Sequence, residues 1–120
     1  IGAVEYIASG GNNQIILCER GIRSFDSRSR NFLDVFAIAE MKRCTGLSII
    51  ADVSHSIGNK EHILPMAKAA IAAGADGIMV EIHPNPNEAL SDGFQQMDLN
   101  ESAQFLQQFN HWWSAHKKSY

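Results

Sequence analysis

The chain has 120 residues, of which 45% are hydrophobic and 19% are charged, a balance typical of one globular domain. Its net charge of −3 argues against nucleic acid or an anionic membrane as a partner, because both select a concentrated basic surface. Apolar runs are only a few residues long, so the sequence predicts no segment that crosses a bilayer.

Hydrophobic periodicity and Gly/Pro punctuation predict that strands and helices alternate along the chain. The tail of a first helix is expected at residues 5–8. Three buried strands are expected at residues 15–18, 47–53 and 77–82. Helices are expected at residues 31–43 and 61–73, and a loop at 83–94. Asp98 and Glu101 have capping-box spacing, so a last helix follows them to about residue 116, with Lys117 and Lys118 near its end.

The strand starts lie about 30 residues apart, which is the length of one βαβ unit. Such units build a parallel sheet that is either doubly wound or closed into a barrel. In both architectures, ligand sites form at the carboxyl ends of the strands. Cys18 lies at that end of its strand, whereas Cys44 ends a returning helix at the opposite pole. We therefore expect two reduced thiols and no disulfide between them.

Polar residues stand at the carboxyl ends of the expected strands, where charged groups are costly unless they are paired, hydrated or bound to a ligand. This pole collects Glu19, Arg20, Ser54, His55, Glu81 and His83, and Asp92 follows in the last loop. Alternation along the strands is expected to set which face His55 and Glu81 occupy.

His55, Glu81 and Asp92 offer one nitrogen and two carboxylate ligands, a set that suits a divalent cation such as Mn²⁺, Fe²⁺ or Zn²⁺. Each residue also has a purely structural explanation. His55 would be a hydrogen-bonded buried histidine, Glu81 would pair with an arginine of a neighbouring strand, and Asp92 would cap a loop. The pattern leaves both interpretations open.

Arg20 and Arg23 add two cations at the same pole, with Gly21 between them. A guanidinium suits phosphate and carboxylate groups because it donates two parallel hydrogen bonds, and Gly21 would let the backbone approach an anion. The alternative is that Arg20 pairs with Glu19 or with another acidic residue.

Four segments together resemble the signatures of 3-deoxy-D-arabino-heptulosonate 7-phosphate (DAHP) synthases. They are ILCERGIR at 16–23, DVSHS at 52–56, VEIHP at 80–84 and ALSDG at 89–93. The chain is most similar to the subfamily shared with 3-deoxy-D-manno-octulosonate 8-phosphate (KDO8P) synthase. Ile22-Arg23 and the run FQQM at 94–97 resemble the DAHP branch more closely.

The resemblance implies an α/β fold that is the C-terminal portion of a (β/α)₈ TIM barrel, with the three strands similar to strands six, seven and eight. Residues 1–120 would then be a partial catalytic domain. The family binds a divalent metal (Mn²⁺, Fe²⁺, Co²⁺ or Zn²⁺) through Cys, His, Glu and Asp. Three of these ligands carry over as His55, Glu81 and Asp92. The family cysteine belongs to an early strand without a counterpart here, and Cys18 lies in a different motif.

The implied reaction condenses phosphoenolpyruvate with erythrose 4-phosphate and water, giving DAHP and phosphate. It is the first step of the shikimate pathway to aromatic amino acids. By the same resemblance, Arg20 contacts phosphoenolpyruvate, and His83 either supports the site and relays protons or is merely structural. A cytoplasmic homo-oligomer is expected. The alternatives are a KDO8P synthase segment and a non-catalytic half-barrel that serves as an interaction module. Because a family barrel needs about 250 residues and Ile1 is not a Met, we expect the natural polypeptide to continue upstream.

Overall fold

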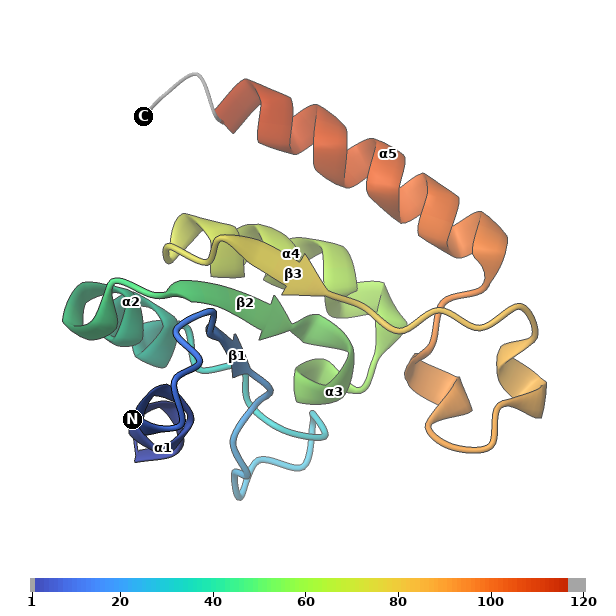
Figure 1. The fold of residues 1–120 in the computed structure, drawn as a ribbon. Helices are drawn as coiled ribbons and strands as arrows, with labels where there is room; N and C mark the ends of the chain where they lie inside the picture. Colours follow the sequence, from blue (N-terminus) through green and yellow to red (C-terminus); the bar gives the residue numbers. More distant parts are fainter. Residues whose placement is uncertain (1, 117–120) are drawn as a thin grey trace.

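A computed structural model describes residues 2–116, and within them three strands form one parallel sheet in the order β1-β2-β3 (Figure 1). The strands are β1 (Ile16–Glu19), β2 (Ser48–Asp52) and β3 (Gly77–Met79). The helices are α1 (Gly2–Ser9), α2 (Val35–Thr45), α3 (Val53–Ile57), α4 (Ile63–Ala72) and α5 (Leu99–His116). The alternating order of strands and helices predicted from the sequence is confirmed, except that α3, directly after β2, was not predicted. Lys117 and Lys118 lie outside the described residues.

Register follows the expected βαβ pattern, because Leu17 pairs with Ile49 and Ala51 pairs with Ile78. These residues point to the face that α2 and α4 cover, where Ile38, Ala67 and Ala70 complete the buried core. The continuous apolar runs predict strands buried on both faces, but within the described residues only this face is covered.

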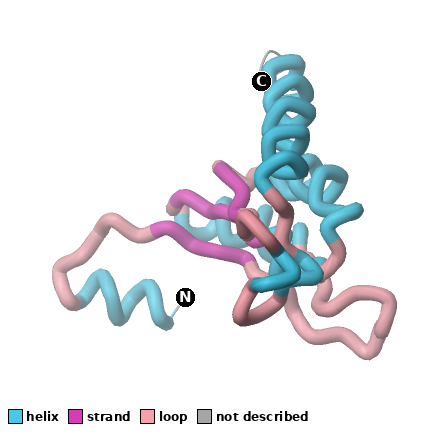
Figure 2. Tube along the Cα trace, turned by 90° about the vertical axis from the view of Figure 1, so that its right-hand side faces the viewer, coloured by secondary structure: helices cyan, strands magenta, loops and turns pink. Residues whose placement is uncertain are grey.

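The other face of the sheet is open. Ile16 and Met79 are 63% and 41% exposed, and Cys18, on the same strand as Ile16, is also exposed, because no helix of the described chain packs there. Figure 2 shows α1 and α5 on opposite sides of the sheet, and neither closes this face. No helix among the described residues is long and apolar enough to cross a membrane.

Two strands end earlier than the sequence predicts. β2 stops at Asp52 instead of residue 53, because the Asp52 side chain caps α3 by accepting a hydrogen bond from the His55 backbone nitrogen at 3.1 Å. β3 stops at Met79 instead of residue 82, and only a single bridge between Ile82 and Met97 continues beside it. His55 and Glu81 therefore follow the strands, whereas Glu19 and Asp52 are the last residues of β1 and β2.

The two long loops of the sheet's carboxyl end contain short 3₁₀ turns, η1 (Lys60–His62), η2 (Pro86–Glu88) and η3 (Gly93–Gln95). Asp98 and Glu101 form the predicted capping box, since each accepts a hydrogen bond from the backbone nitrogen of the other at 2.9 and 2.8 Å. α5 then packs on α4 through Phe105 and Phe109.

Candidate metal centre and anion site

His55, Glu81 and Asp92 come together at the carboxyl end of the sheet, as the sequence predicts. One ligand atom of each lies within 4.8 Å of the others. His55 Nε2 is 3.4 Å from Glu81 Oε1 and 4.0 Å from Asp92 Oδ2. The alternation argument for His55 is wrong, because this residue projects from α3 and not from β2. Glu81 follows β3, and Asp92 directly precedes η3.

Each of the three residues uses one side-chain atom for the scaffold and turns another toward the centre. His55 Nδ1 is bonded to Asp52 Oδ2 at 2.8 Å, Glu81 Oε2 accepts from Gln95 Nε2 at 3.1 Å, and Asp92 Oδ1 pairs with Arg30 at 2.9 Å. The atoms left over, Nε2, Oε1 and Oδ2, are the three that converge. The geometry is therefore that of a preorganised ligand set.

The backbone around Asp92 is tightly constrained. Asp92 has φ 54°, in the left-handed region where a non-Gly residue is uncommon. A Cβ on the next residue, Gly93, would fall 2.1 Å from the carbonyl oxygen of Pro86, so this position admits no side chain. The turn holds Asp92 over the end of the sheet, and the carboxylate pairs with Arg30 instead of capping the loop.

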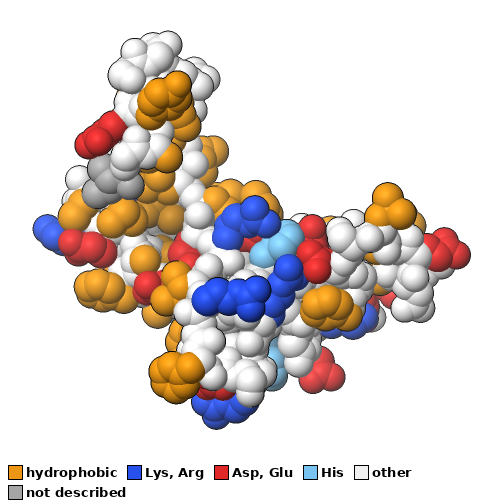
Figure 3. Space-filling model, turned by 90° about the horizontal axis from the view of Figure 1, so that it is seen from below, with side chains coloured by type: hydrophobic (Ala, Val, Ile, Leu, Met, Phe, Trp, Pro, Cys, Tyr) orange, Lys and Arg blue, Asp and Glu red, His pale blue; other side chains and the backbone are white. Residues whose placement is uncertain are grey.

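Arg20 and Arg30 place two positive charges beside the three carboxylates of Asp52, Glu81 and Asp92. Figure 3 shows Lys or Arg side chains next to a histidine and to acidic side chains near the middle of one face. By formal charge, the three carboxylates outnumber the two guanidinium groups by one. That negative excess, and the inward oxygens, favour a cation at the centre.

Arg20 combines a buried contact with an exposed end. Its Nε donates to Asp52 Oδ2 at 3.1 Å, while the side chain stays 59% exposed. Among the residues that the structure describes, the two terminal nitrogens of Arg20 have no hydrogen-bond partner. The sequence alternative of an acidic partner is thus correct for Nε, although the partner is Asp52 and not Glu19. Gly21, at φ 86°, packs where a Cβ would lie 2.8 Å from Ser56.

The family follows from comparison with known proteins. A sequence profile described as the DAHP synthetase I family matches residues 1–118. The chain belongs to this family. A phospho-2-dehydro-3-deoxyheptonate aldolase of Thermotoga maritima is 47% identical over 88% of this chain and 31% of its own length. A 2-dehydro-3-deoxyphosphooctonate aldolase of Francisella tularensis is 36% identical over 82% of this chain and 38% of its own length.

Solved structures give the same relation. The crystal structure of the Thermotoga maritima DAHP synthase superposes with a TM-score of 0.89 at 45% identity, covering 94% of this chain and 33% of that one. A truncated form of the same enzyme gives a TM-score of 0.88 and is covered to 43%. This DAHP synthetase family chain therefore spans about a third of the length of the curated relatives it matches.

The residues present fit a divalent metal of the kind that the family uses. Nitrogen and oxygen ligands held about 2.0–2.2 Å from one ion lie roughly 3–4 Å apart, and the two measured separations, 3.4 and 4.0 Å, fall in that range. The ion's identity is not fixed by this donor set. Cys18 is not among the clustered residues. Partial removal of its sulfur from water, followed by the charge of Asp52, raises the pKa of the Cys18 thiol, and this disfavours the thiolate that binds metals.

Glu19 and His83 also lie at the carboxyl end of the sheet, but their hydrogen bonds do not involve the three clustered residues. Glu19 Oε1 accepts a hydrogen bond from the Gly21 backbone nitrogen at 2.8 Å, and burial raises the pKa of its carboxyl. His83 Nδ1 accepts from the Asn85 backbone nitrogen at 3.1 Å. No hydrogen bond within residues 2–116 joins His83 to the three clustered residues, so its part in the site stays a prediction.

Sequence reasoning did not assign roles to Asp52, Arg30 and Gln95, which hold the three ligands. Asp52 carried a weak signal, because Asp is a preferred N-cap residue, and it caps α3 in the structure. Arg30 and Gln95 carried none, since they are 65 residues apart and meet only in the folded chain, where their side chains bond at 2.7 Å.

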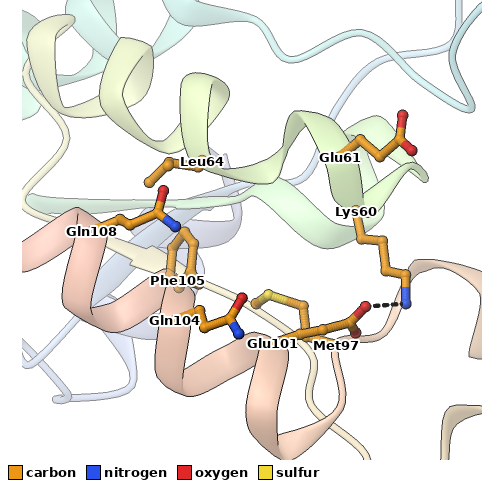
Figure 4. Close-up of a pocket in the computed structure, with 8 residues that line it drawn as sticks. All are labelled: Lys60, Glu61, Leu64, Met97, Glu101, Gln104, Phe105 and Gln108. Carbon is orange, nitrogen blue, oxygen red and sulfur yellow. Dashed lines mark hydrogen bonds and ion pairs between the residues drawn. The ribbon is translucent and has the colours of Figure 1, made fainter.

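A groove of about 360 Å³ lies between α4 and α5 (Figure 4). Leu64 and Phe105 line it, and Lys60 and Glu101 pair at 2.6 Å at one end. None of the three clustered residues or their three supports lines this groove.

Proposed function

We propose that this chain carries part of the active site of a DAHP synthase. That enzyme condenses phosphoenolpyruvate with erythrose 4-phosphate and water to give DAHP and phosphate, with carbon three of the enol attacking the aldehyde. The observation that carries the proposal is the convergence of His55, Glu81 and Asp92 beside Arg20 in a member of the DAHP synthetase I family.

His55, Glu81 and Asp92 would hold a divalent ion (Mn²⁺, Fe²⁺, Co²⁺ or Zn²⁺). When bound, such an ion supplies Lewis acidity toward the aldehyde or positions water. The chain's own contribution is orientation: Asp52, Gln95 and Arg30 keep the ligand atoms turned inward before anything binds.

Arg20 would bind phosphoenolpyruvate through its terminal nitrogens, which take no part in the Asp52 contact. A guanidinium gives bidentate hydrogen bonds to carboxylate or phosphate and offsets the charge that develops as phosphate leaves. Arg30 cannot take this part with the same atom, because its Nη1 already bonds Gln95 and Asp92.

We further propose that residues 1–120 are the C-terminal part of a (β/α)₈ barrel, equivalent to strands six to eight. Two observations support this: the chain covers 33% of the Thermotoga enzyme, and one face of its sheet is open. The remaining strands would bring the rest of the substrate pockets. A cytoplasmic homo-oligomer remains part of the proposal.

The test is an activity measurement on the full-length protein with added Mn²⁺. We expect phosphoenolpyruvate to be consumed with erythrose 4-phosphate and much more slowly with arabinose 5-phosphate. Preference for the pentose would assign the chain to the KDO8P branch, represented by the 36% identical relative. No turnover of either sugar and no metal binding would favour the non-catalytic half-barrel.

Replacing His55 with Ala gives a second, residue-level test. The variant loses the only nitrogen ligand of the cluster, so we expect bound metal and metal-dependent turnover to fall together by at least about 100-fold. Metal content after desalting, measured by atomic emission, separates this from a defect in turnover alone. Unchanged metal content would remove His55 from the site.

A further inference from the structure

Asp52 occupies an unusual position for a charged residue. Its side chain is 0% exposed, at the end of the central strand, and it is one of the few buried carboxylates of the described chain. A buried carboxylate is tolerated only when its oxygens are well satisfied. Asp52 achieves this with three side-chain hydrogen bonds, one to Arg20 and two to His55, and the proposed function needs both of these residues.

One oxygen of Asp52 joins the two halves of the site. Oδ2 accepts from Arg20 Nε at 3.1 Å and bonds His55 Nδ1 at 2.8 Å, while Oδ1 accepts from the His55 backbone nitrogen at 3.1 Å. We propose that Asp52 is a shared positioning residue, which sets the orientation of the metal ligand His55 and of the anion-binding Arg20 together. This inference rests on the proposed function.

The His55 half of the inference follows from hydrogen-bond chemistry. An ionised carboxylate only accepts, so the ring nitrogen that faces Asp52 must carry the proton. The lone pair of the neutral ring is then on Nε2, which is the atom directed at Glu81 and Asp92. Without the carboxylate, the ring is free to rotate or to place its proton on Nε2, and both changes remove a ligand.

The inference for Arg20 follows from the small number of contacts that hold its side chain in place. Apart from the Nε contact with Asp52, the guanidinium has no hydrogen-bond partner among residues 2–116, and 59% of the side chain is exposed. An unanchored arginine keeps many rotamers, which an anion must then restrict at a cost in affinity. Asp52 thus orders Arg20 before substrate arrives.

The positioning of Arg20 by Asp52 can be distinguished experimentally from the effect of the Asp52 charge alone. Removing a negative charge next to Arg20 would by itself strengthen the binding of an anion. Loss of positioning weakens it. The sign of the change in phosphoenolpyruvate affinity therefore decides between a shared anchor and a mere local charge.

The experiment compares Asp52→Asn with wild-type full-length protein after metal has been stripped by a chelator. The Asn oxygen still caps α3, but the amide cannot accept from His55 and Arg20 as the carboxylate does. We expect Mn²⁺ affinity, read from the electron paramagnetic resonance signal of the free ion, to fall about 10- to 100-fold. We expect phosphoenolpyruvate affinity of the metal-free protein, measured by calorimetry, to fall about tenfold.

Asp34→Asn is the matched control. Asp34 caps α2 by accepting from the Ala37 backbone nitrogen at 2.8 Å and is not among the metal-ligating group, so both affinities should match wild type. Asp52→Ser, which also retains a capping oxygen, is the second variant if Asp52→Asn does not fold, and we expect the same two losses.

Unchanged Mn²⁺ affinity in either folded Asp52 variant, or tighter binding of phosphoenolpyruvate, would overturn the proposal that Asp52 is a shared positioning residue. A wild-type protein that binds neither Mn²⁺ nor phosphoenolpyruvate would instead overturn the proposed function. The two failures are therefore distinguishable in the same measurements.

Discussion

Gln95 is the residue that most directly links the two carboxylates of the candidate centre. Its side chain is fully buried, and both ends of the amide are used: Nε2 donates to Glu81 and Oε1 accepts from Arg30, which also pairs with Asp92. Gln95→Met keeps the volume and removes both bonds. We expect Mn²⁺ affinity to fall about tenfold, because Glu81 and Arg30 lose the partner that fixes them. Equilibrium dialysis followed by metal analysis measures this directly.

The adjacent glutamine provides the control for that prediction. Gln96 is also buried, but its Nε2 donates to the backbone oxygen of Ser91 and not to a ligand side chain. Gln96→Met should therefore keep most of the metal affinity. Equal losses in the two variants would mean that the loop, and not the Gln95 amide, holds Glu81 in place.

At the residue scale, the sequence and the family resemblance were sufficient to name the candidate ligands that the fold brings together, and insufficient for the residues that support them. His55, Glu81 and Arg20 are polar residues that follow apolar strands, and this local contrast is visible in the sequence, whereas Asp92 lies in a loop and was named through its spacing and the ALSDG segment. Gln95 and Arg30 lie in polar loop segments, where a polar residue gives no indication of a functional role. Their importance comes from burial and from each other, and both are properties of the folded chain.

At the element scale, the capping box at the start of α5 is expected to stabilise the first turn of this helix against local unfolding. Asp98→Ala removes the oxygen that accepts from the Glu101 nitrogen at 2.8 Å, a loss of about 1 kcal/mol for such a cap. We expect the first-turn amides of α5 to exchange with deuterium about fivefold faster in the full-length protein. Hydrogen exchange read by mass spectrometry on peptides that cover residues 99–105 tests this.

Asn100→Ala is the matched control, because Asn100 lies in the same turn with an exposed side chain and makes no capping bond. Exchange in this variant should match wild type. Equal rates for Asp98→Ala and wild type would show that packing of Phe105 and Phe109 on α4, and not the capping box, sets the stability of this end.

Element order and type could be predicted because the apolar periodicities of β1, β2 and α5 are long or strongly punctuated. The boundary between β2 and α3 could not be predicted from periodicity. Val53 continues the apolar run of the strand. Nevertheless, the strand ends at Asp52, because the Asp52 side chain caps the backbone and Val53 becomes the first residue of α3. The hydrogen bond of the Asp52 side chain thus determines the position of His55, and a hydrophobic pattern carries no information about such a bond.

At the scale of the whole molecule, the chain is less compact than its size allows. Its accessible surface is 7943 Å², against about 6,400 Å² for a compact monomer of 13.2 kDa. Its radius of gyration is 15.4 Å, against about 13.6 Å for a compact domain of this length. The open face of the sheet contributes to this excess through exposed Ile16, Cys18 and Met79, and α1 and the loops contribute through residues such as Tyr6 and Phe25.

This open face leads to a prediction for residues 1–120 produced alone. Exposed apolar sheet faces and unpaired parallel edges promote association, so we expect oligomers by sedimentation velocity at micromolar concentration and strong binding of an apolar dye. Ile16→Lys combined with Met79→Lys places charges on that face and should shift the chain toward monomer. Leu90→Lys, which changes a fully exposed residue away from the sheet, should leave the association unchanged. A monomer that unfolds cooperatively and binds no dye would contradict the prediction, and it would favour a half-barrel that is stable as an independent module.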